Sequence, residues 1–129
     1  MTSRALRNRY VSDSVATAPP AQLLVMLYDR LVLDLMIAAQ AIGAGDRTIS
    51  SARLQHAQEI IMEFRVTLDT SAWSGGPGLS GLYSYMINEL VQANITGDRA
   101  RVEIVQGFAE QLRDAWREAA AQVAGAAAA

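Results

Sequence analysis

Few side chains in this chain of 129 residues are of types that carry chemistry. There is no cysteine and a single histidine, His56, so disulfides, thiolate metal sites and cysteine catalysis are excluded. A di-metal carboxylate site in a helical bundle uses the Glu-x-x-His motif twice, and no glutamate stands three residues before His56. No serine lies in a Gly-x-Ser-x-Gly turn that would present it as a nucleophile. The sequence therefore predicts no enzyme, no metal site and no cofactor.

The other polar groups are assigned solvated or connecting roles. His56 lies beside the apolar stripe of its segment and is interpreted as a solvated histidine. The run SGGPG at 74–78 lacks the Gly-Lys-Ser/Thr of a phosphate-binding loop and is interpreted as a flexible connection. Asp29 and Asp34 border an apolar face in the first long segment. There they either orient a partner or keep that face compatible with water.

Composition argues against nucleic-acid and membrane partners. The net charge is −2 with a sequence pI of about 5.3, which is not the basic footprint expected for nucleic acid or an anionic membrane. Hydrophobic residues make up 51% and charged residues 19%, so the chain should fold as one domain. No run of about 18 uncharged apolar residues is present, so membrane insertion is not expected. We expect a soluble protein of the cytoplasm.

Turn signals divide the chain into a tail and four long segments. The breaks are rich in the proline, glycine and aspartate residues typical of helix ends, and they stand at 17–20, 43–46, 70–78 and 96–98. Asp46 is placed to cap the helix that follows it, and Gly97 is placed to take the left-handed conformation at a helix end. The four segments are therefore expected to be helices.

Each segment repeats apolar residues at intervals of three or four, which is the helical period. The four stripes are Leu24, Leu27, Tyr28, Leu31, Leu35, Ala38 and Ile42; Leu54, Ala57, Ile61, Phe64 and Leu68; Leu79, Leu82, Tyr83, Met86, Leu90 and Ala93; and Val102, Val105, Ala109, Leu112, Trp116, Ala119 and Val123. No segment alternates like a strand, and short connections favour antiparallel neighbours. The predicted fold is all-α, an antiparallel up-down four-helix bundle over residues 17–123, with an N-terminal lid segment over 1–16 and a disordered Ala-rich tail over 124–129.

The first helix carries more apolar surface than one core needs. Four large side chains lie nearly opposite its core stripe, at Leu23, Met26, Leu33 and Ile37. If they stay in water, roughly 6–12 kcal/mol of burial free energy is unused. The other helices repeat the signal more weakly, at Tyr85, Ile104 and Phe108. These side chains either pack under a loop or the tail, or they line grooves for the amphipathic segment of a partner.

The N-terminal tail supplies a candidate lid for such a groove. Leu6 and Tyr10 are four residues apart and Val11 follows them. A segment this short buries little area and must be ordered to do so, so its grip should be modest and a partner should be able to displace it. The alternative is an N-terminus without fixed structure.

Several motifs together resemble the FliS family of flagellar secretion chaperones. The run from APPAQLLVMLYD through ARLQHAQEIIMEFRVTLD and GLYSYMINELVQAN to QLRDAWREA matches the family in the same order over about residues 10–119. The specific parts are Leu-Tyr-x-Tyr-Met at 82–86, Ala-Asn at 93–94 and Leu-Arg-Asp-x-Trp at 112–116. Tyr10 also resembles the N-terminal signature of the family.

The resemblance implies a bundle in the bacterial cytoplasm that binds the disordered C-terminal region of flagellin. It implies that the chaperone keeps flagellin subunits from polymerising early and delivers them to the flagellar type III export apparatus, with an export gate component as a further partner. It also implies that the N-terminal segment, including Tyr10, occupies part of the client site when no client is bound.

A rival interpretation assigns the surplus apolar surface to self-association. In it, the row containing Met26, Leu33 and Ile37 meets its own copy in a twofold dimer, and the bundle acts as a structural or regulatory adaptor. The oligomeric state without client distinguishes the two.

Overall fold

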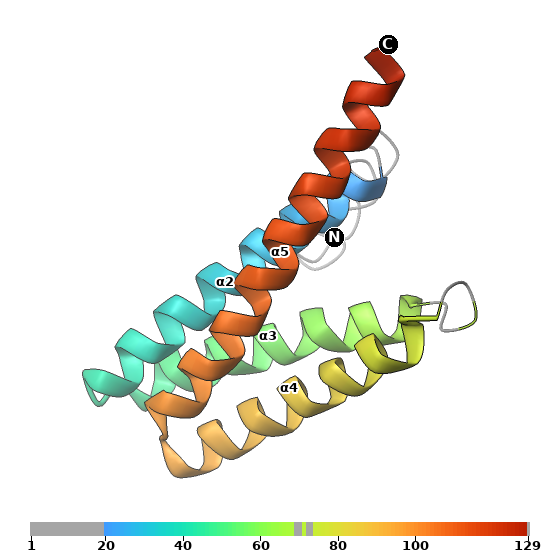
Figure 1. Cartoon of the computed structure of the whole chain (residues 1–129). Coiled ribbons are helices and arrows are strands. Elements are labelled where there is room, and N and C mark those ends of the chain that lie inside the picture. The colour runs from blue at the N-terminus through green and yellow to red at the C-terminus, as the bar shows by residue number, and fades with distance from the viewer. Residues whose placement is uncertain (1–19, 69–70, 72–73, 129) are drawn as a thin grey trace, which may run out of the picture.

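The computed structural model describes residues 20–68, 71 and 74–128 (Figure 1). The described residues form four helices and no strand. The helices are α2 (Pro20–Gly43), α3 (Arg47–Thr67), α4 (Gly76–Thr96) and α5 (Arg99–Ala128). Each packs against two others, α2 against α3 and α5, and α4 against the same two. This ring of antiparallel helices confirms the predicted all-α four-helix bundle.

The helix ends follow from the residues predicted to form them. The Asp46 carboxylate accepts a hydrogen bond from the backbone N–H of Ile49 at 3.1 Å and so caps α3. Gly97 ends α4 with φ of 67°, a left-handed conformation that glycine adopts without steric cost. Asp98 then accepts from the backbone N–H of Ala100 at 3.0 Å at the start of α5. The predictions for Asp46 and Gly97 are confirmed.

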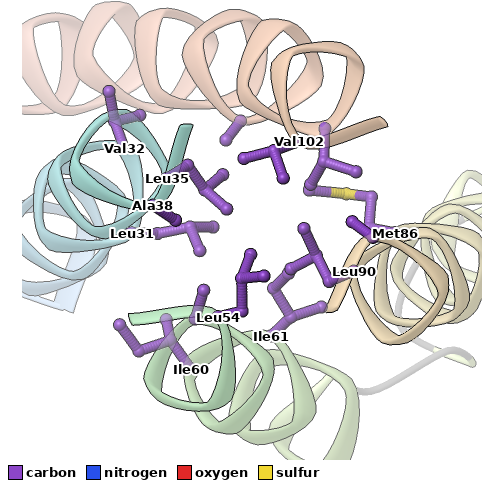
Figure 2. Packing of buried hydrophobic residues seen from close by; sticks show 14 of the residues in the cluster. Leu31, Val32, Leu35, Ala38, Leu54, Ile60, Ile61, Met86, Leu90 and Val102 are labelled. Carbon is purple, nitrogen blue, oxygen red and sulfur yellow. The ribbon is translucent and has the colours of Figure 1, made fainter. Parts of the chain in front are cut away.

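The core is built from the predicted apolar stripes (Figure 2). The large apolar side chains with no exposed surface come from all four helices: Tyr28, Leu31, Leu35, Leu54, Ile61, Met86, Leu90, Val102 and Val105. Full burial of a side chain of this size contributes about 1.5–3 kcal/mol relative to exposure. Burial of the apolar stripes therefore accounts for the assembly of the four helices into a bundle.

The bundle is less closely packed toward the start of α2. Figure 1 shows the pair α2 and α5 diverging from the pair α3 and α4 in this direction. The apolar side chains at this end pack against the core but are only partly buried, among them Leu24, Leu27, Leu68, Leu79, Leu82, Leu112 and Trp116. This end of the molecule therefore keeps core residues partly open to solvent.

The C-terminal half of α5 departs from two expectations. Val123 is exposed rather than part of the core, because α5 is the longest helix and its end projects beyond its neighbours (Figure 1). The helix also continues to Ala128, whereas the sequence predicts a disordered tail over 124–129. Alanine has the highest helix propensity of all residues, which favours continuation of the helix through this Ala-rich run.

Candidate functional site

The outward side of α2 carries part of the predicted partner surface. Met26 is 52% exposed and Leu33 is 46% exposed, while Leu23 and Ile37 are half-buried. The two exposed side chains lie seven residues apart, so two turns of the helix separate them on one side. The predicted surplus of apolar surface on the first helix is therefore present.

A second apolar cluster lies where α4 meets α5. The rings of Tyr85 and Phe108 pack edge to face, with centroids 6.0 Å apart and planes at 89°. Phe108 also contacts the core, whereas Tyr85 is 43% exposed and Ile104, one turn before Phe108, is 50% exposed. The structure brings these three predicted site residues together.

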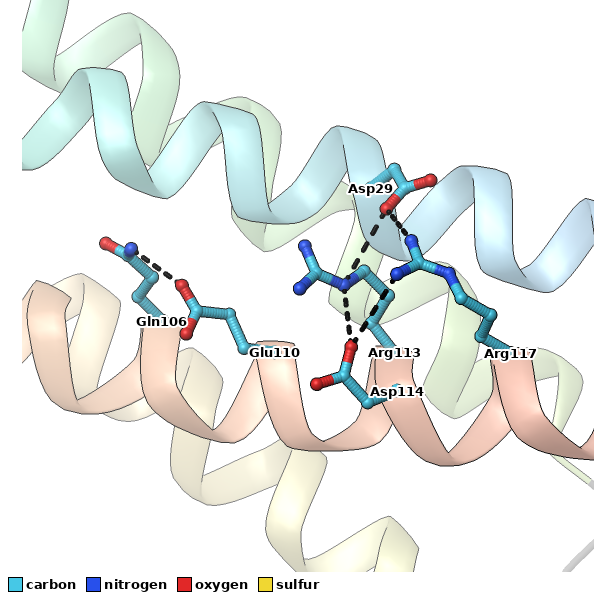
Figure 3. A network of polar contacts seen from close by, with 6 residues as sticks. All are labelled: Asp29, Gln106, Glu110, Arg113, Asp114 and Arg117. Atoms are coloured by element: carbon cyan, nitrogen blue, oxygen red, sulfur yellow. Dashed lines mark hydrogen bonds and ion pairs between the residues drawn. The ribbon is translucent and has the colours of Figure 1, made fainter.

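The two clusters do not form one continuous surface. In the described part of the chain α2 and α4 are diagonal in the bundle and make no backbone contact, and α5 packs between them on one side. On the α2 side of α5 stand the hydrogen-bonded pair Gln106 and Glu110 and a polar network of Arg113, Asp114 and Arg117 (Figure 3). The predicted site residues therefore lie on two separate apolar surfaces.

Asp29 joins this polar network to α2 (Figure 3). Its Oδ1 accepts a hydrogen bond from Nη2 of Arg117 at 3.1 Å and lies 3.8 Å from Nε of Arg113. Ion pairs this exposed contribute about 0–1 kcal/mol each. The structure thus gives Asp29 a contact with α5 in addition to the two roles considered from the sequence.

The surroundings of the Asp34 and His56 side chains differ from those that the sequence predicts. Asp34 has no exposed surface, and its two oxygens accept from Arg53 at 3.0 Å and contact Nδ1 of His56. Arg30 lies 4.0 Å away. The placement of Asp34 at the border of a wet face is wrong, because Asp34 is fully buried between α2 and α3. The interpretation of His56 as solvated is wrong as well, because its side chain is only 21% exposed and contacts Asp34.

A signal for this contact is present in the sequence. Arg53 and His56 are three residues apart on the helix that follows Asp34, and two adjacent antiparallel helices can bring such groups opposite one another. The apolar stripes alone do not predict this contact. They give the direction of Asp34 around the axis of α2, but not which neighbouring helix covers that side.

Two buried tyrosines form the other polar contact of the core. The hydroxyl oxygens of Tyr28 and Tyr83 lie 2.6 Å apart, and the Phe64 ring stacks on Tyr28 with a centroid distance of 4.5 Å. Burial, with the Tyr83 hydrogen bond, raises the pKa of Tyr28 above its ordinary value, and burial also raises the pKa of Tyr83. Both phenols therefore stay neutral at physiological pH and act as structural groups.

The remaining expectations concern groups outside these clusters. The lid residues Leu6, Tyr10 and Val11 lie outside the described residues. Within the described residues no group of three His, Cys, Asp or Glu side chains could hold a metal ion. None of the described helices is long and apolar enough to cross a membrane.

Sequence reasoning missed a set of exposed apolar residues around α4. Ile95 is 67% exposed, and Val91 on α4 and Met62 and Val66 on α3 are exposed as well. The available signal was that Val91 and Ile95 stand off the core stripe of their helix. On α4, Val91 and Ile95 add exposed apolar side chains to Tyr85.

The sequence of this chain is similar to one known protein family and to several of its members. The model of the family described as "Flagellar protein FliS" matches residues 2–123. The "Flagellar secretion chaperone FliS" of Bacillus subtilis (strain 168) is 36% identical over 118 residues, covering 89% of this chain and 88% of the relative. The protein with the same description from Salmonella typhimurium is 34% identical over 112 residues, covering 84% and 82%.

A solved structure shares the fold. The "Crystal structure of flagellar chaperone from bacteria" superposes with a TM-score of 0.74 at 16% sequence identity, covering 94% of this chain and 99% of that chain. At this identity the likeness concerns the arrangement of the helices alone.

Proposed function

The chain belongs to the FliS family of flagellar secretion chaperones, and on this basis we propose that it binds the disordered C-terminal region of flagellin in the cytoplasm. It is a chaperone and not an enzyme. The bound chaperone keeps flagellin from polymerising early and aids its delivery to the flagellar type III export apparatus, where a gate component is a further partner.

The observation that carries the proposal is apolar surface left outside the core on two sides of the bundle. Met26 and Leu33 expose about half their surface on α2, as does Ile104 on α5. Rows of this kind are uncommon on a protein with no partner, whereas single exposed apolar residues are normal. Apolar grooves are a usual way of recognising amphipathic segments.

Energetics favour a client that covers both surfaces. Each large apolar side chain contributes about 1.5–3 kcal/mol only when fully buried, and half of that is already realised here. Ordering a disordered client costs about 2–5 kcal/mol or more. One cluster of two or three half-exposed side chains barely offsets that cost, so we expect a long client segment in contact with both.

This mechanism needs no nucleotide. The terminal segments of flagellin bury apolar stripes against neighbours in the filament, and the chaperone offers replacement contacts for them. Binding free energy alone then removes the tendency to polymerise.

The proposal is tested by isothermal titration calorimetry with the flagellin of the source organism. A peptide of its C-terminal region should bind with a negative heat-capacity change, the mark of apolar burial, and flagellin lacking that region should not bind. Absence of binding to the intact flagellin would contradict the proposal.

The alternative occupant of the α2 row is a second copy of the chain. Sedimentation without client separates the two: a tight dimer that Met26→Asp dissociates would favour self-association, and a monomer would favour the client.

A further inference from the structure

Two turns at one end of the bundle repeat the same short sequence. Residues 45–47 and residues 97–99 both read Gly-Asp-Arg, the first where α3 follows α2 and the second where α5 follows α4. Both glycines are left-handed, with φ of 74° at Gly45 and 67° at Gly97. In both turns the aspartate accepts a hydrogen bond from a backbone N–H in the first turn of the next helix. The bundle is therefore built from two helical hairpins with similar turns.

The arginine of each turn contacts the other hairpin. Arg47, at the start of α3, donates to the backbone oxygen of Asn94 on α4 at 2.7 Å. A Cβ atom added at Gly97 would collide with the same guanidinium. Arg99, at the start of α5, lies in the same way against Gly43 at the end of α2. Cationic side chains are favoured near the C-terminal ends of helices. Two turns and two arginines thus tie the four helices into a closed ring at this end.

The arginine contacts pair the helices into two layers, one of α2 and α5 and the other of α3 and α4. Each layer is also tied farther from the turns. Asp29 of α2 accepts from Arg117 of α5 at 3.1 Å, and Arg65 of α3 donates to Ser84 of α4 at 3.2 Å. The segment between α3 and α4 joins two helices of one layer. Among the four described helices, the chain therefore passes from one layer to the other only at the two turns.

Burial between the layers decreases with distance from the turns. Near the turns, Ala93 and Val102 have no exposed surface. Toward the opposite end, which we call the open end, the two layers diverge (Figure 1). The apolar side chains there, such as Leu27, Leu82 and Trp116, are only partly buried. The layers are therefore closely packed at the turns and less closely packed at the open end.

The hydroxyl groups of Tyr28 and Tyr83 join the two layers in the half of the bundle that includes the open end. Their oxygens lie 2.6 Å apart, one on α2 and the other on α4. The ring of Phe64 on α3 also crosses between the layers and stacks on Tyr28. If the layers separate there, water replaces the lost partner of each hydroxyl, so the net cost of breaking this hydrogen bond is small. The pair is thus a contact that can break and form again.

We propose that the bundle is a hinge of two layers, with the two Gly-Asp-Arg turns as its axis and the hydroxyl pair of Tyr28 and Tyr83 as the latch of its open end. Hinges in proteins are a few loop or terminal residues that absorb backbone rotation, and Gly45 and Gly97 hold such positions. Opening exposes the partly buried side chains between the layers without unfolding a helix. The inference does not depend on which client the chaperone binds.

Distances between spin labels measure the opening directly. The chain has no cysteine, so two introduced cysteines carry nitroxide labels at chosen sites. Gln22→Cys with Gly81→Cys spans α2 and α4 at the open end, and Gln40→Cys with Gln92→Cys spans the same helices near the turns. All four positions are exposed, and a Cβ atom at Gly81 meets nothing within 4 Å. Double electron–electron resonance gives the distance distribution of each pair, in the absence of client.

The latch is removed by Tyr28→Phe together with Tyr83→Phe, which keeps both rings and leaves neither hydroxyl buried without its partner. The distribution at the open end should broaden and shift to longer distances, whereas the distribution near the turns should stay as in the wild type. A second variant, Arg47→Ala with Arg99→Ala, should instead broaden the distribution near the turns. If the variant without the latch loses helical circular dichroism, Tyr83→Phe alone takes its place with the same expectation.

Three outcomes would overturn the inference. An unchanged distribution at the open end of the folded variant would show that the hydroxyl pair is no latch. Equal broadening at both ends would show a general loosening and not a rotation about the turns. An unchanged distribution near the turns after removal of both arginines would show that they do not hold the ring together. All of these measurements are made without client, so they test the hinge and leave the proposed function as it stands.

Discussion

The hydroxyl groups of Tyr28 on α2 and Tyr83 on α4 meet across the core, with their oxygens 2.6 Å apart. The two helices are diagonal in the bundle and make no backbone contact in the described part of the chain. This side-chain pair therefore joins two helices whose backbones are not in contact. Within the sequence the two residues belong to the LYD and LYSYM runs, so these motifs have a structural role in the core.

Removal of either hydroxyl should destabilise the domain. Tyr28→Phe leaves the Tyr83 hydroxyl buried without its partner, and a buried unpaired hydroxyl costs about 1–3 kcal/mol. Tyr83→Phe leaves the Tyr28 hydroxyl without this partner in the same way and should cost a similar amount. Urea unfolding of both single variants and the double variant measures the coupling. Strictly additive losses would show that the hydroxyls do not act as a pair.

The stability of the folded domain should fall in alkaline solution, because both tyrosine hydroxyls are buried in their neutral form. The folded-state pKa values of Tyr28 and Tyr83 lie above the ordinary value of 10.0 because of burial. The unfolded chain therefore releases these protons first, and the stability contributed by the neutral phenols is complete below pH of about 10 and is lost as the pH rises above it. Unfolding midpoints measured across this range should decline less steeply for Tyr28→Phe. An equal slope for the variant would contradict the assignment to Tyr28.

The buried and the exposed aspartates of α2 should differ in their effect on stability. Asp34→Asn leaves Arg53 and His56 facing a neutral amide, and we expect a loss of about 2 kcal/mol or more even though both partners are partly exposed. Asp29→Asn removes only exposed ion pairs and should cost less than about 1 kcal/mol. Denaturant unfolding of the two matched variants gives the comparison. Equal losses would mean that the cluster around Asp34 contributes no more than a surface network.

The N-terminal segment should be dispensable for folding. The buried core cluster is formed by residues between Tyr28 and Ala109, so deletion of residues 2–15 should leave a cooperative melting transition and unchanged helical circular dichroism. A collapsed transition in the shortened chain would make the segment part of the core. The prediction that residues 1–16 are a lid separate from the bundle is tested by this measurement.

The helical period was enough to predict the fold and not enough to predict the site. Leu54, Ile61 and Leu90 are buried because a stripe at intervals of three and four can only face the centre of such a bundle. Asp34 was misplaced because a stripe does not tell which helix covers its edge. Val123 was misplaced because periodicity does not tell where the neighbouring helices end.

The candidate surfaces were predictable in part. Met26 and Leu33 are exposed as expected, since a helix in a four-helix bundle cannot bury both of its sides. Val91 and Ile95 were not singled out, because they stand off the core stripe of α4 and belong to no motif.

The central claim is that the apolar surfaces outside the core hold the client. Its most direct test is calorimetry with the C-terminal peptide of the source organism's flagellin and the variants Met26→Asp, Ile104→Asp and their combination, with Thr48→Asp as the control. Each single variant should weaken binding by at least about tenfold, since an aspartate buried without a partner is costly. The double variant should bind no peptide while retaining its helical content. Wild-type affinity in the folded double variant would contradict the account.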